Sequence, residues 1–423
     1  MTRAVSQIAV GVLVQVLAIS CWFATAAAVP SLTVAFGLGP IGRVLLVVAV
    51  QAGFAVGAVV VGLTRLCDRL PPALLVSLGS AATAAMTVLP LVDDSSFELL
   101  LASRVGVGLL LATVYPAGMR ATVSWASPRW RGLAVAGVVA ALTLGTAAPW
   151  LLDASPVEDW RQVLVVCALA AGASALLALT LRSGPYVTTG RQGDDAARTD
   201  GPHSAGSGAV DSRIARSRIA GSRNPLRRPG QRRITLAYVG HMWEVYGLWV
   251  WLPALLLAIP SLAPRDAGGS TGLLAFVLIG VVGALGCLAG GVLASRYGKR
   301  VVARWSVVIS TACAASTPLL PEAPAVLAVL LLALWSASAI ADSPLYSALT
   351  GDEADPDQVG SAIALQMGIG YLASIGAISG VLALAELVGW RYAFLPLAIG
   401  PLIAAIALRP GPWWRMSAQS GTL

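Results

Sequence analysis

Residues Ser183–Arg233 read SGPYVTTGRQGDDAARTDGPHSAGSGAVDSRIARSRIAGSRNPLRRPGQRR and separate two hydrophobic parts of similar length. The stretch has no apolar periodicity and is rich in Gly, Ser, Pro and Arg. Such a composition buries too little apolar surface to offset the entropy lost on ordering. With ten Arg and four Asp, it supplies six of the chain's eight net positive charges. We therefore predict a basic, flexible linker here.

The sequence on both sides of this linker has the composition of a membrane protein. Of 423 residues, 57% are hydrophobic and 11% are charged, and the mean hydropathy is +0.79. A soluble globular chain carries about 25% charged residues. Runs of roughly 20 apolar residues, long enough to cross a ~30 Å hydrocarbon core, recur throughout. The fold class predicted is an all-α integral membrane protein.

Twelve such runs are predicted to be transmembrane helices, six before the linker and six after it. They lie near residues 8–29, 44–64, 73–92, 98–120, 133–152 and 161–182, and near 234–258, 272–294, 301–320, 324–347, 360–385 and 392–409. The predicted domains are an N-terminal bundle (1–182), the linker (183–233), a C-terminal bundle (234–409) and a cytoplasmic tail (410–423). The first run is long and many others follow, so we interpret it as an uncleaved helix rather than a cleaved signal peptide.

Basic residues gather in alternate loops. The loops on the same side as the linker and both termini hold 23 of the 28 Arg and Lys residues, which marks that side as cytoplasmic. The prediction is a multi-pass protein of a bacterial inner (cytoplasmic) membrane, with both termini in the cytoplasm. The positive charge follows this alternation, so we expect a lipid bilayer and not nucleic acid as partner. We also expect a monomer. The five Cys show no paired or metal-ligand spacing, so we expect no disulfide framework, metal or other cofactor.

A repeat relates the two halves. Asp159-Trp160-Arg161 opens the sixth run, and Gly389-Trp390-Arg391 opens the twelfth, 230 residues later. The loops after the second and eighth runs read TRLCDRLP (64–71) and GVLASRYGKR (291–300), and matching Asp68 to Ser295 gives a displacement of 227. Two landmarks at nearly one displacement indicate duplicated six-helix halves, an architecture of secondary transporters.

These loops carry a family resemblance. The second closely resembles the G-x-L-A-D-R-x-G-R-K loop of the major facilitator superfamily, with Ser295 in place of the acid. The first keeps Asp68-Arg69 but has Thr64 and Pro71 where the family has glycines. The segment RVGVG (104–108) is similar to the fourth-helix R-x-x-x-G signature. The resemblance implies a transporter of two pseudo-symmetric six-helix bundles that works by alternating access, and it leaves the substrate open.

The same loops suggest a conformational latch. Charges just past a helix end can meet a neighbouring helix N-terminus or an acid across the loop. The resemblance implies this role for four residues: Asp68, Arg69, Arg296 and Lys299. The alternative is that these charges only set the topology of the chain.

Four ionisable residues fall inside predicted spans: Arg104, His241, Glu244 and Asp342. Each costs ~2.5 to 3.5 kcal/mol at the middle of a helix, so it should face a cavity or a partner. Arg104 starts a helical stripe that continues to Tyr115. We interpret Arg104 as an anion contact or a charge that gates a proton site. The alternative is a structural Arg that ties helices together.

His241 and Glu244 are three residues apart and share one helix face. Such a pair can exchange a proton at physiological pH, although a solvated position near the helix end is the alternative. Asp342, with Pro344 and Tyr346 after it, suggests a broken helix with binding groups. The alternative is a helix end with Asp342 paired to a loop Arg.

Aromatic residues provide further candidates. A dense run around Trp249 extends well into the seventh span, so some of its rings should line a cavity, although an interfacial belt is the ordinary explanation. Trp22 in the first span is a second candidate wall. The substrate or proton site is thus predicted from Trp22, Arg104, Tyr115, His241, Glu244, Trp249, Asp342 and Tyr346.

The motifs that are missing restrict the function. The sequence has no G-x-x-x-x-G-K-[ST], so ATP does not drive it directly, and no G-x-S-x-G, H-E-x-x-H or C-x-x-C, so no enzyme is expected. The fifth span lacks the adjacent Gly-Pro of the superfamily's drug–proton antiporters. We predict proton-coupled transport (symport) of a small organic solute, an anion among the candidates. The alternatives are proton-driven efflux of amphipathic drugs or toxic metabolites, and a membrane sensor that does not transport.

Overall fold

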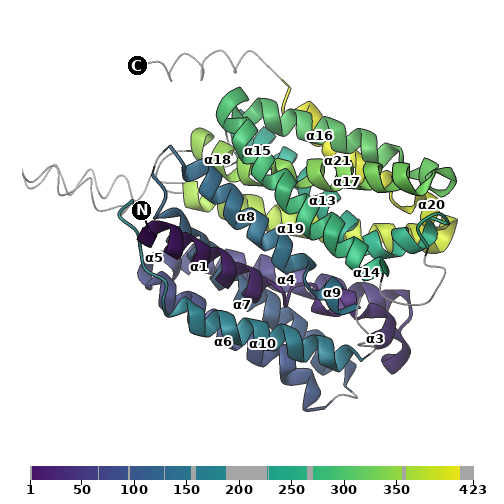
Figure 1. The fold of residues 1–423 in the computed structure, drawn as a ribbon, viewed down its shortest axis with the longest axis horizontal. Coiled ribbons are helices and arrows are strands. Elements are labelled where there is room, and N and C mark those ends of the chain that lie inside the picture. The colour runs from purple at the N-terminus through teal and green to yellow at the C-terminus, as the bar shows by residue number, and fades with distance from the viewer. Residues whose placement is uncertain are drawn as a thin grey trace, which may run out of the picture.

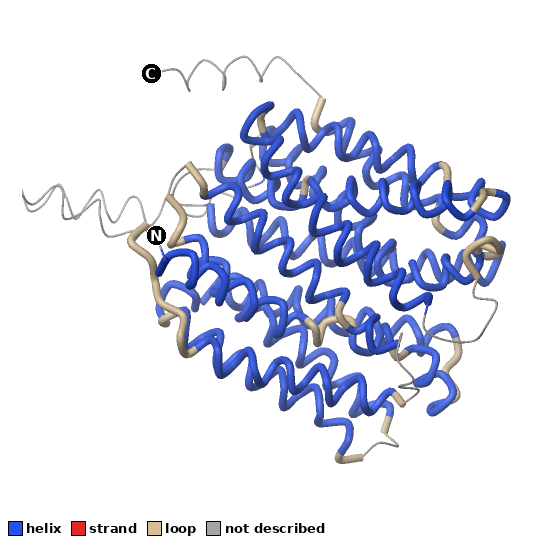
Figure 2. The backbone as a smooth tube through the Cα atoms, in the orientation of Figure 1, coloured by secondary structure: helices blue, strands red, loops and turns tan. Residues whose placement is uncertain are grey.

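The computed structural model describes residues 2–64, 66–93, 96–127, 129–153, 159–186, 226, 228–263, 270–354 and 359–409. These residues form helices joined by short connections and contain no strand (Figure 2). Most of the predicted linker and the whole predicted tail, 410–423, lie outside this description.

The N-terminal half contains the six helical runs that the sequence predicts, several of them divided into shorter helices. Its elements are α1 (Thr2–Ile19), α2 (Ala24–Ala27), α3 (Val29–Phe36), α4 (Pro40–Thr64), α5 (Leu66–Arg69), α6 (Pro72–Val88), η1 (Leu89–Leu91), α7 (Phe97–Val123), α8 (Arg131–Ala147), α9 (Pro149–Asp153) and α10 (Trp160–Ala178). The first run comprises α1 to α3, and α5 is a short helix in the loop between the second and third runs.

The C-terminal half contains six further runs. Its elements are α13 (Pro229–Ala258), α14 (Ser270–Ala275), the π-helical segment η3 (Phe276–Val282), α15 (Gly283–Tyr297), α16 (Lys299–Ala315), η4 (Thr317–Glu322), α17 (Ala325–Ala341), α18 (Ser343–Glu353), α19 (Val359–Val388), α20 (Trp390–Ala393), η5 (Leu395–Ala398) and α21 (Ile399–Ala407). Helix α13 starts at Pro229, whereas the sequence placed its start at 234. Proline fits the first turn of a helix because its fixed φ is already helical and no partner is needed there for a backbone N–H.

Nine helical segments among the described residues are long and apolar enough to cross a membrane, and Arg3–Ile19 is a shorter apolar helix. The two other predicted spans correspond to α13 and α16. Helix α13 contains Arg232, Arg233, His241 and Glu244, which lower its hydropathy, although most of its residues are buried. His241 and Glu244 are buried against neighbouring helices, whereas Arg232 and Arg233 are exposed near the start of the helix.

Figure 1 shows the two halves side by side, the N-terminal helices in purple to teal and the C-terminal helices in green to yellow. They meet along α4 with α19 and along α8 with α15. The N-terminus, α5 and α18 lie at one end of the molecule, and α3, α14 and α20 lie at the other. The first is called the basic end, because the Arg- and Lys-rich loops lie there, and the second is called the opposite end.

Helices α4 and α7 cross at very short distance. A Cβ added to Gly108 of α7 would lie 2.0 Å from the carbonyl oxygen of Val50, and one added to Gly53 of α4 would lie 2.0 Å from that of Val105. Both obstacles are backbone atoms, which cannot rotate away. Small residues that let backbones approach are the usual basis of helix packing in membranes, and they explain the glycine at position 108.

Candidate functional site

A cavity of about 340 Å³ lies between the two halves. Its walls come from α7 and α8 on one side and from α13, α17, α18 and α19 on the other. Among the lining residues of α7, α13 and α19, those farthest from the basic end are Tyr115, Trp249 and Tyr371. From there it extends past Arg120 to Val123, the last residue of α7, at the basic end.

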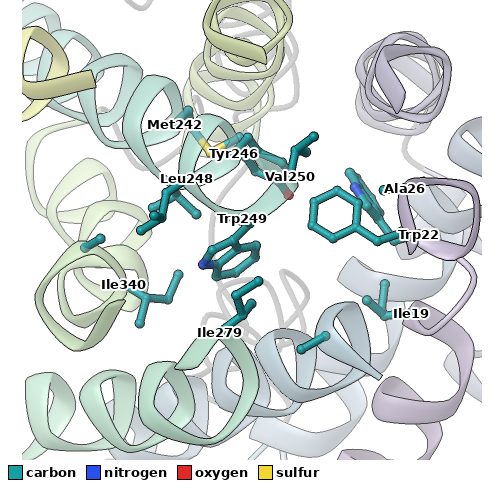
Figure 3. Close-up of a cluster of buried hydrophobic side chains, with 14 of the residues drawn as sticks. Ile19, Trp22, Ala26, Met242, Tyr246, Leu248, Trp249, Val250, Ile279 and Ile340 are labelled. Atoms are coloured by element: carbon teal, nitrogen blue, oxygen red, sulfur yellow. The ribbon is translucent and has the colours of Figure 1, made fainter. Parts of the chain in front are cut away.

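Aromatic rings from both halves close the space beyond the cavity toward the opposite end. This aromatic cluster consists of Trp22, Phe23, Phe54, Tyr246, Trp249 and Tyr371. The ring centroids of Trp22 and Tyr246 are 5.9 Å apart, and those of Phe54 and Tyr371 are 4.6 Å apart. Figure 3 shows Trp22 of the N-terminal half on one side and Tyr246 and Trp249 of α13 on the other. Edge-to-face and tilted contacts of this kind are favourable packing arrangements.

An ion pair also joins the halves at the opposite end. Arg43 lies in the first turn of α4, and Glu386 lies near the end of α19. Arg43 Nη2 lies 2.7 Å from Glu386 Oε1, and both side chains are partly exposed. The aromatic cluster and this ion pair together hold the two halves closed at this end.

A buried acid–imidazole pair stands in the cavity wall. His241 of α13 lines the cavity, and its Nδ1 lies 2.9 Å from Asp342 Oδ1, an ion-pair contact when the imidazole is protonated. The hydroxyl of Tyr346 donates to the other oxygen, Asp342 Oδ2, at 2.7 Å. All three side chains are almost completely buried. His241 therefore connects the lining of the cavity to a carboxylate in the interior.

The break that the sequence predicts near Asp342 is present. Helix α17 ends at Ala341, Asp342 connects it to α18, and Pro344 lies in the first turn of α18. The partner of Asp342 is His241 rather than a loop Arg. Asp342 lies at this junction, where its carboxylate approaches His241 of α13.

Glu244 has a different environment from His241, and the predicted His241–Glu244 pair is not formed. Trp335 Nε1 donates to Glu244 Oε1 at 2.7 Å, and the Ser310 hydroxyl donates to Oε2 at 3.0 Å. Residues three apart on a helix are offset by about 60° around its axis. This offset is enough to direct His241 toward α18 and Glu244 toward α16 and α17. Glu244 thus lies behind the cavity wall, buried and held by two neutral donors.

Arg104 lies away from the cavity. Its Nε donates to the Ser103 hydroxyl at 3.3 Å and its Nη2 to the Thr87 carbonyl at 3.5 Å, between α6 and α7. Tyr115, the other end of the predicted stripe, does line the cavity. Eleven residues of helix separate the two by roughly 16 Å along the axis, so one cavity does not include both. This position agrees with the alternative of a structural Arg that ties helices together.

The predicted site residues thus lie in different parts of the structure. Tyr115, His241 and Trp249 line the cavity, Asp342 and Tyr346 stand behind His241, and Trp22 belongs to the aromatic cluster. Sequence reasoning missed Arg120, Tyr238, Ser310 and Trp335. Arg120 was counted only as a loop charge. Tyr238 lies three residues before His241, so helical spacing could have placed it on the same face. Ser310 and Trp335 are on other helices, and no spacing in the sequence relates them to this site.

The latch candidates lie at the basic end. Lys299 Nζ contacts both oxygens of Asp352, at 2.9 and 2.7 Å, and the neighbouring Arg300 pairs with Glu353. These contacts tie the first turn of α16 to the end of α18, within the C-terminal half. Arg296 lies over the ring of Tyr297, 5.3 Å from its centroid. Arg69 is exposed, and the side chain of Asp68 is outside the described part of the chain. A latch role for these four residues stays a prediction.

Comparisons with known proteins agree with this architecture. The structure is similar to a proton:xylose symporter, XylE, with a TM-score of 0.71 at 13% identity, covering 95% of this chain and 94% of that one. It is also similar to a bacterial homologue of the human lysosomal transporter Spinster (TM-score 0.65, 16% identity, 96% of each chain). The E. coli fucose:proton symporter FucP gives a TM-score of 0.62 at 16% identity over 96% of this chain and 98% of that one.

At these identities the structural likenesses show the fold, and no curated protein sequence matches this chain. A family model described as Major Facilitator Superfamily matches residues 11–378, which include most of both halves. The chain therefore belongs to the Major Facilitator Superfamily of membrane transporters.

Proposed function

We propose that this transporter couples the movement of a small organic solute to protons across a bacterial inner membrane. The observation that carries the proposal is the cavity with His241 in its wall and Asp342 directly behind it. Two of the similar structures, those of the xylose and fucose symporters, are of proton symporters, which supports proton coupling here.

The buried pair provides a physical basis for coupling. With the imidazole protonated, His241 and Asp342 form a pair without net charge, which a dry interior tolerates. When the proton leaves, a single carboxylate charge remains, and its desolvation is costly. The neutral pair is therefore compatible with a dry, closed cavity, and a lone carboxylate charge with a cavity that admits water. This difference links the proton to the conformation of the halves.

The distribution of charge gives the orientation. The basic end faces the cytoplasm by the positive-inside rule, which puts both termini there. The cavity extends toward that end, and the aromatic cluster closes the other end. The conformation is then inward-facing, and alternating access requires the opposite end to open in turn.

Disrupting the Arg43–Glu386 ion pair should favour opening of that end. An ion pair with this exposure contributes at most about 1 kcal/mol, so Arg43→Ala should raise the outward-open population roughly fivefold or less. Spin labels at Val34 and Leu387, both highly exposed and on opposite halves, would report the change as a longer distance. The background should lack Cys67, because the other four cysteines are buried.

Two variants serve as controls for this measurement. Combining Arg43→Glu with Glu386→Arg should restore the wild-type distances, because the pair is re-formed with its charges exchanged. Arg391→Ala removes an ion pair with Glu322 that lies within one half, and it should leave the distances unchanged. An unchanged distribution in Arg43→Ala would mean that the ion pair does not hold the halves together.

The test of the proposed function is solute-driven proton movement. Purified protein in liposomes with a trapped pH dye would be given benzenesulfonate, succinate, tetraethylammonium or D-xylose, one at a time. At least one solute should move protons inward, with no response from protein-free liposomes. Uptake of a radiolabelled solute with no proton movement and no dependence on a pH gradient would contradict proton coupling.

Export of amphipathic compounds is the second candidate, favoured by the largely apolar lining of the cavity. A strain without this protein should then become more susceptible to such compounds, whereas loss of an importer should leave susceptibility unchanged. Flux of any solute would exclude a purely sensory role.

A further inference from the structure

The side chain of Asp342 has two partners within the described part of the chain, His241 and Tyr346. His241 Nδ1 lies at ion-pair distance from Asp342 Oδ1, 2.9 Å, but these two atoms make no hydrogen bond. The hydroxyl of Tyr346 donates to Asp342 Oδ2 at 2.7 Å. Among the described residues, Tyr346 thus supplies the one hydrogen bond that this buried carboxylate accepts.

Tyr346 contacts both members of the pair. It lies four residues after Asp342, so the two side chains meet on one side of α18. Its ring packs against the imidazole of His241, with centroids 5.3 Å apart, and against the ring of Tyr238, with centroids 5.6 Å apart. Tyr346 is completely buried. Its hydroxyl and its ring therefore hold the carboxylate and the imidazole in place.

The helix that carries Tyr346 also borders the cavity. Ser343 and Ser347 of α18 line the cavity, and they follow Asp342 and Tyr346 directly in the chain. A solute that contacts these serines therefore touches the helix on which the proton site depends. Tyr346 itself stands behind the lining.

The hydroxyl of Tyr346 stabilises the two protonation states of the pair unequally. With the imidazole protonated, the charge of Asp342 is balanced by His241. After the proton leaves, Asp342 is a lone charge in a dry interior, where a hydrogen bond to it is worth most. The Tyr346 hydroxyl thus favours the deprotonated pair.

We propose that Tyr346 is a positioning residue of the proton site, and that its hydroxyl makes the His241–Asp342 pair release its proton more readily. The biological meaning of this role rests on the proposed function, in which the pair couples protons to the solute. The role itself concerns only the proton affinity of the pair, which can be measured without a solute.

Other ionisable groups surround the pair, and they stay the same when Tyr346 is changed. Glu244 of α13 and Cys287 of α15 are close enough to Asp342 to interact with its charge. The cavity that His241 lines has five more ionisable side chains: Tyr115, Arg120, Tyr238, Tyr246 and Tyr371. Comparing the parent chain with Tyr346→Phe isolates the hydroxyl, because phenylalanine keeps a ring against His241.

The histidine content of the chain allows this proton to be observed directly. The sequence has two histidines, His203 and His241, so a parent chain with His203→Gln keeps only His241. NMR of the ¹⁵N-histidine-labelled chain in nanodiscs would distinguish the neutral from the protonated imidazole over about pH 5 to 9. The parent should show one transition. In Tyr346→Phe the midpoint should lie about one pH unit higher, a tenfold tighter hold on the proton.

Two further variants test the assignment to the hydroxyl. Tyr346→Leu also lacks it and should move the midpoint in the same direction. Tyr371→Phe is the matched control, because it removes a buried tyrosine hydroxyl that lies 3.2 Å from that of Tyr246 and does not contact Asp342. Its midpoint should equal that of the parent chain. Thermal unfolding of each variant would confirm that it is folded.

Three results would overturn the inference: an unchanged or lower midpoint in Tyr346→Phe, an equal rise in Tyr371→Phe, or an imidazole that keeps one protonation state throughout in the parent chain. The proposed function fails separately. A higher midpoint in Tyr346→Phe, together with solute flux that moves no protons, would support the role of Tyr346 and contradict proton coupling. Proton-coupled flux with an unchanged midpoint would do the reverse.

Discussion

Asp342→Asn should abolish solute-driven proton movement while the protein still folds. Asparagine has nearly the same shape and can still accept the hydrogen bond from Tyr346, but it carries no charge to balance a protonated His241. Removing one partner of a buried ion pair costs about 3–5 kcal/mol, so the rate of solute-driven proton movement should fall at least about a hundredfold. The pH-dye assay in liposomes measures this loss directly.

Exchange of the same solute across the membrane without a pH gradient should persist in Asp342→Asn, because the cavity walls are unchanged. Glu322→Gln makes the same chemical change at an exposed residue of the opposite end and should behave as wild type. If Asp342→Asn still moved protons with the solute, the coupling group would have to be sought elsewhere, with Glu244 the first candidate.

Gly108→Ala should lower the free energy of unfolding by about 1–3 kcal/mol, the usual cost of overpacking. The added methyl group would lie 2.0 Å from the carbonyl oxygen of Val50, so α4 and α7 would have to separate. Thermal unfolding in one detergent, with wild type alongside, measures the difference.

Gly137→Ala provides the comparison for this variant. Gly137 lies within α8, and a Cβ there would meet nothing within 4 Å. The same substitution should therefore be neutral or should stabilise the helix by about 0.5–1 kcal/mol, because alanine loses less backbone entropy on folding. Equal melting temperatures for the two variants would show that the α4–α7 crossing relaxes easily.

The fold was accessible from the sequence because its signals are local. A run of apolar residues identifies a membrane helix without knowledge of its neighbours, and the alternation of Arg and Lys orders the loops. The start of α13 was misplaced because Pro229 and Arg232 belong by composition to the linker, although they form the first turn of the helix.

The site was only partly predictable, because its contacts join helices far apart in the chain. The cost of burying a charge singled out His241, Glu244 and Asp342, and all three are buried. The cost of burial shows that each charged group needs a partner but does not show which residue it is, so the pairing of His241 with Asp342 was missed. Arg104 shows the same limit, since a buried guanidinium can face a cavity or another helix of its own bundle.

The three rings of Tyr246, Trp249 and Tyr371 belong both to the cavity wall and to the aromatic cluster that seals the opposite end. A guest that stacks on them competes with Trp22, Phe23 and Phe54 for the same surfaces. Binding of a solute and opening of the opposite end thus depend on the same side chains. Selection for a new solute at these positions would also change how the aromatic cluster closes the opposite end, so the two properties are expected to evolve together.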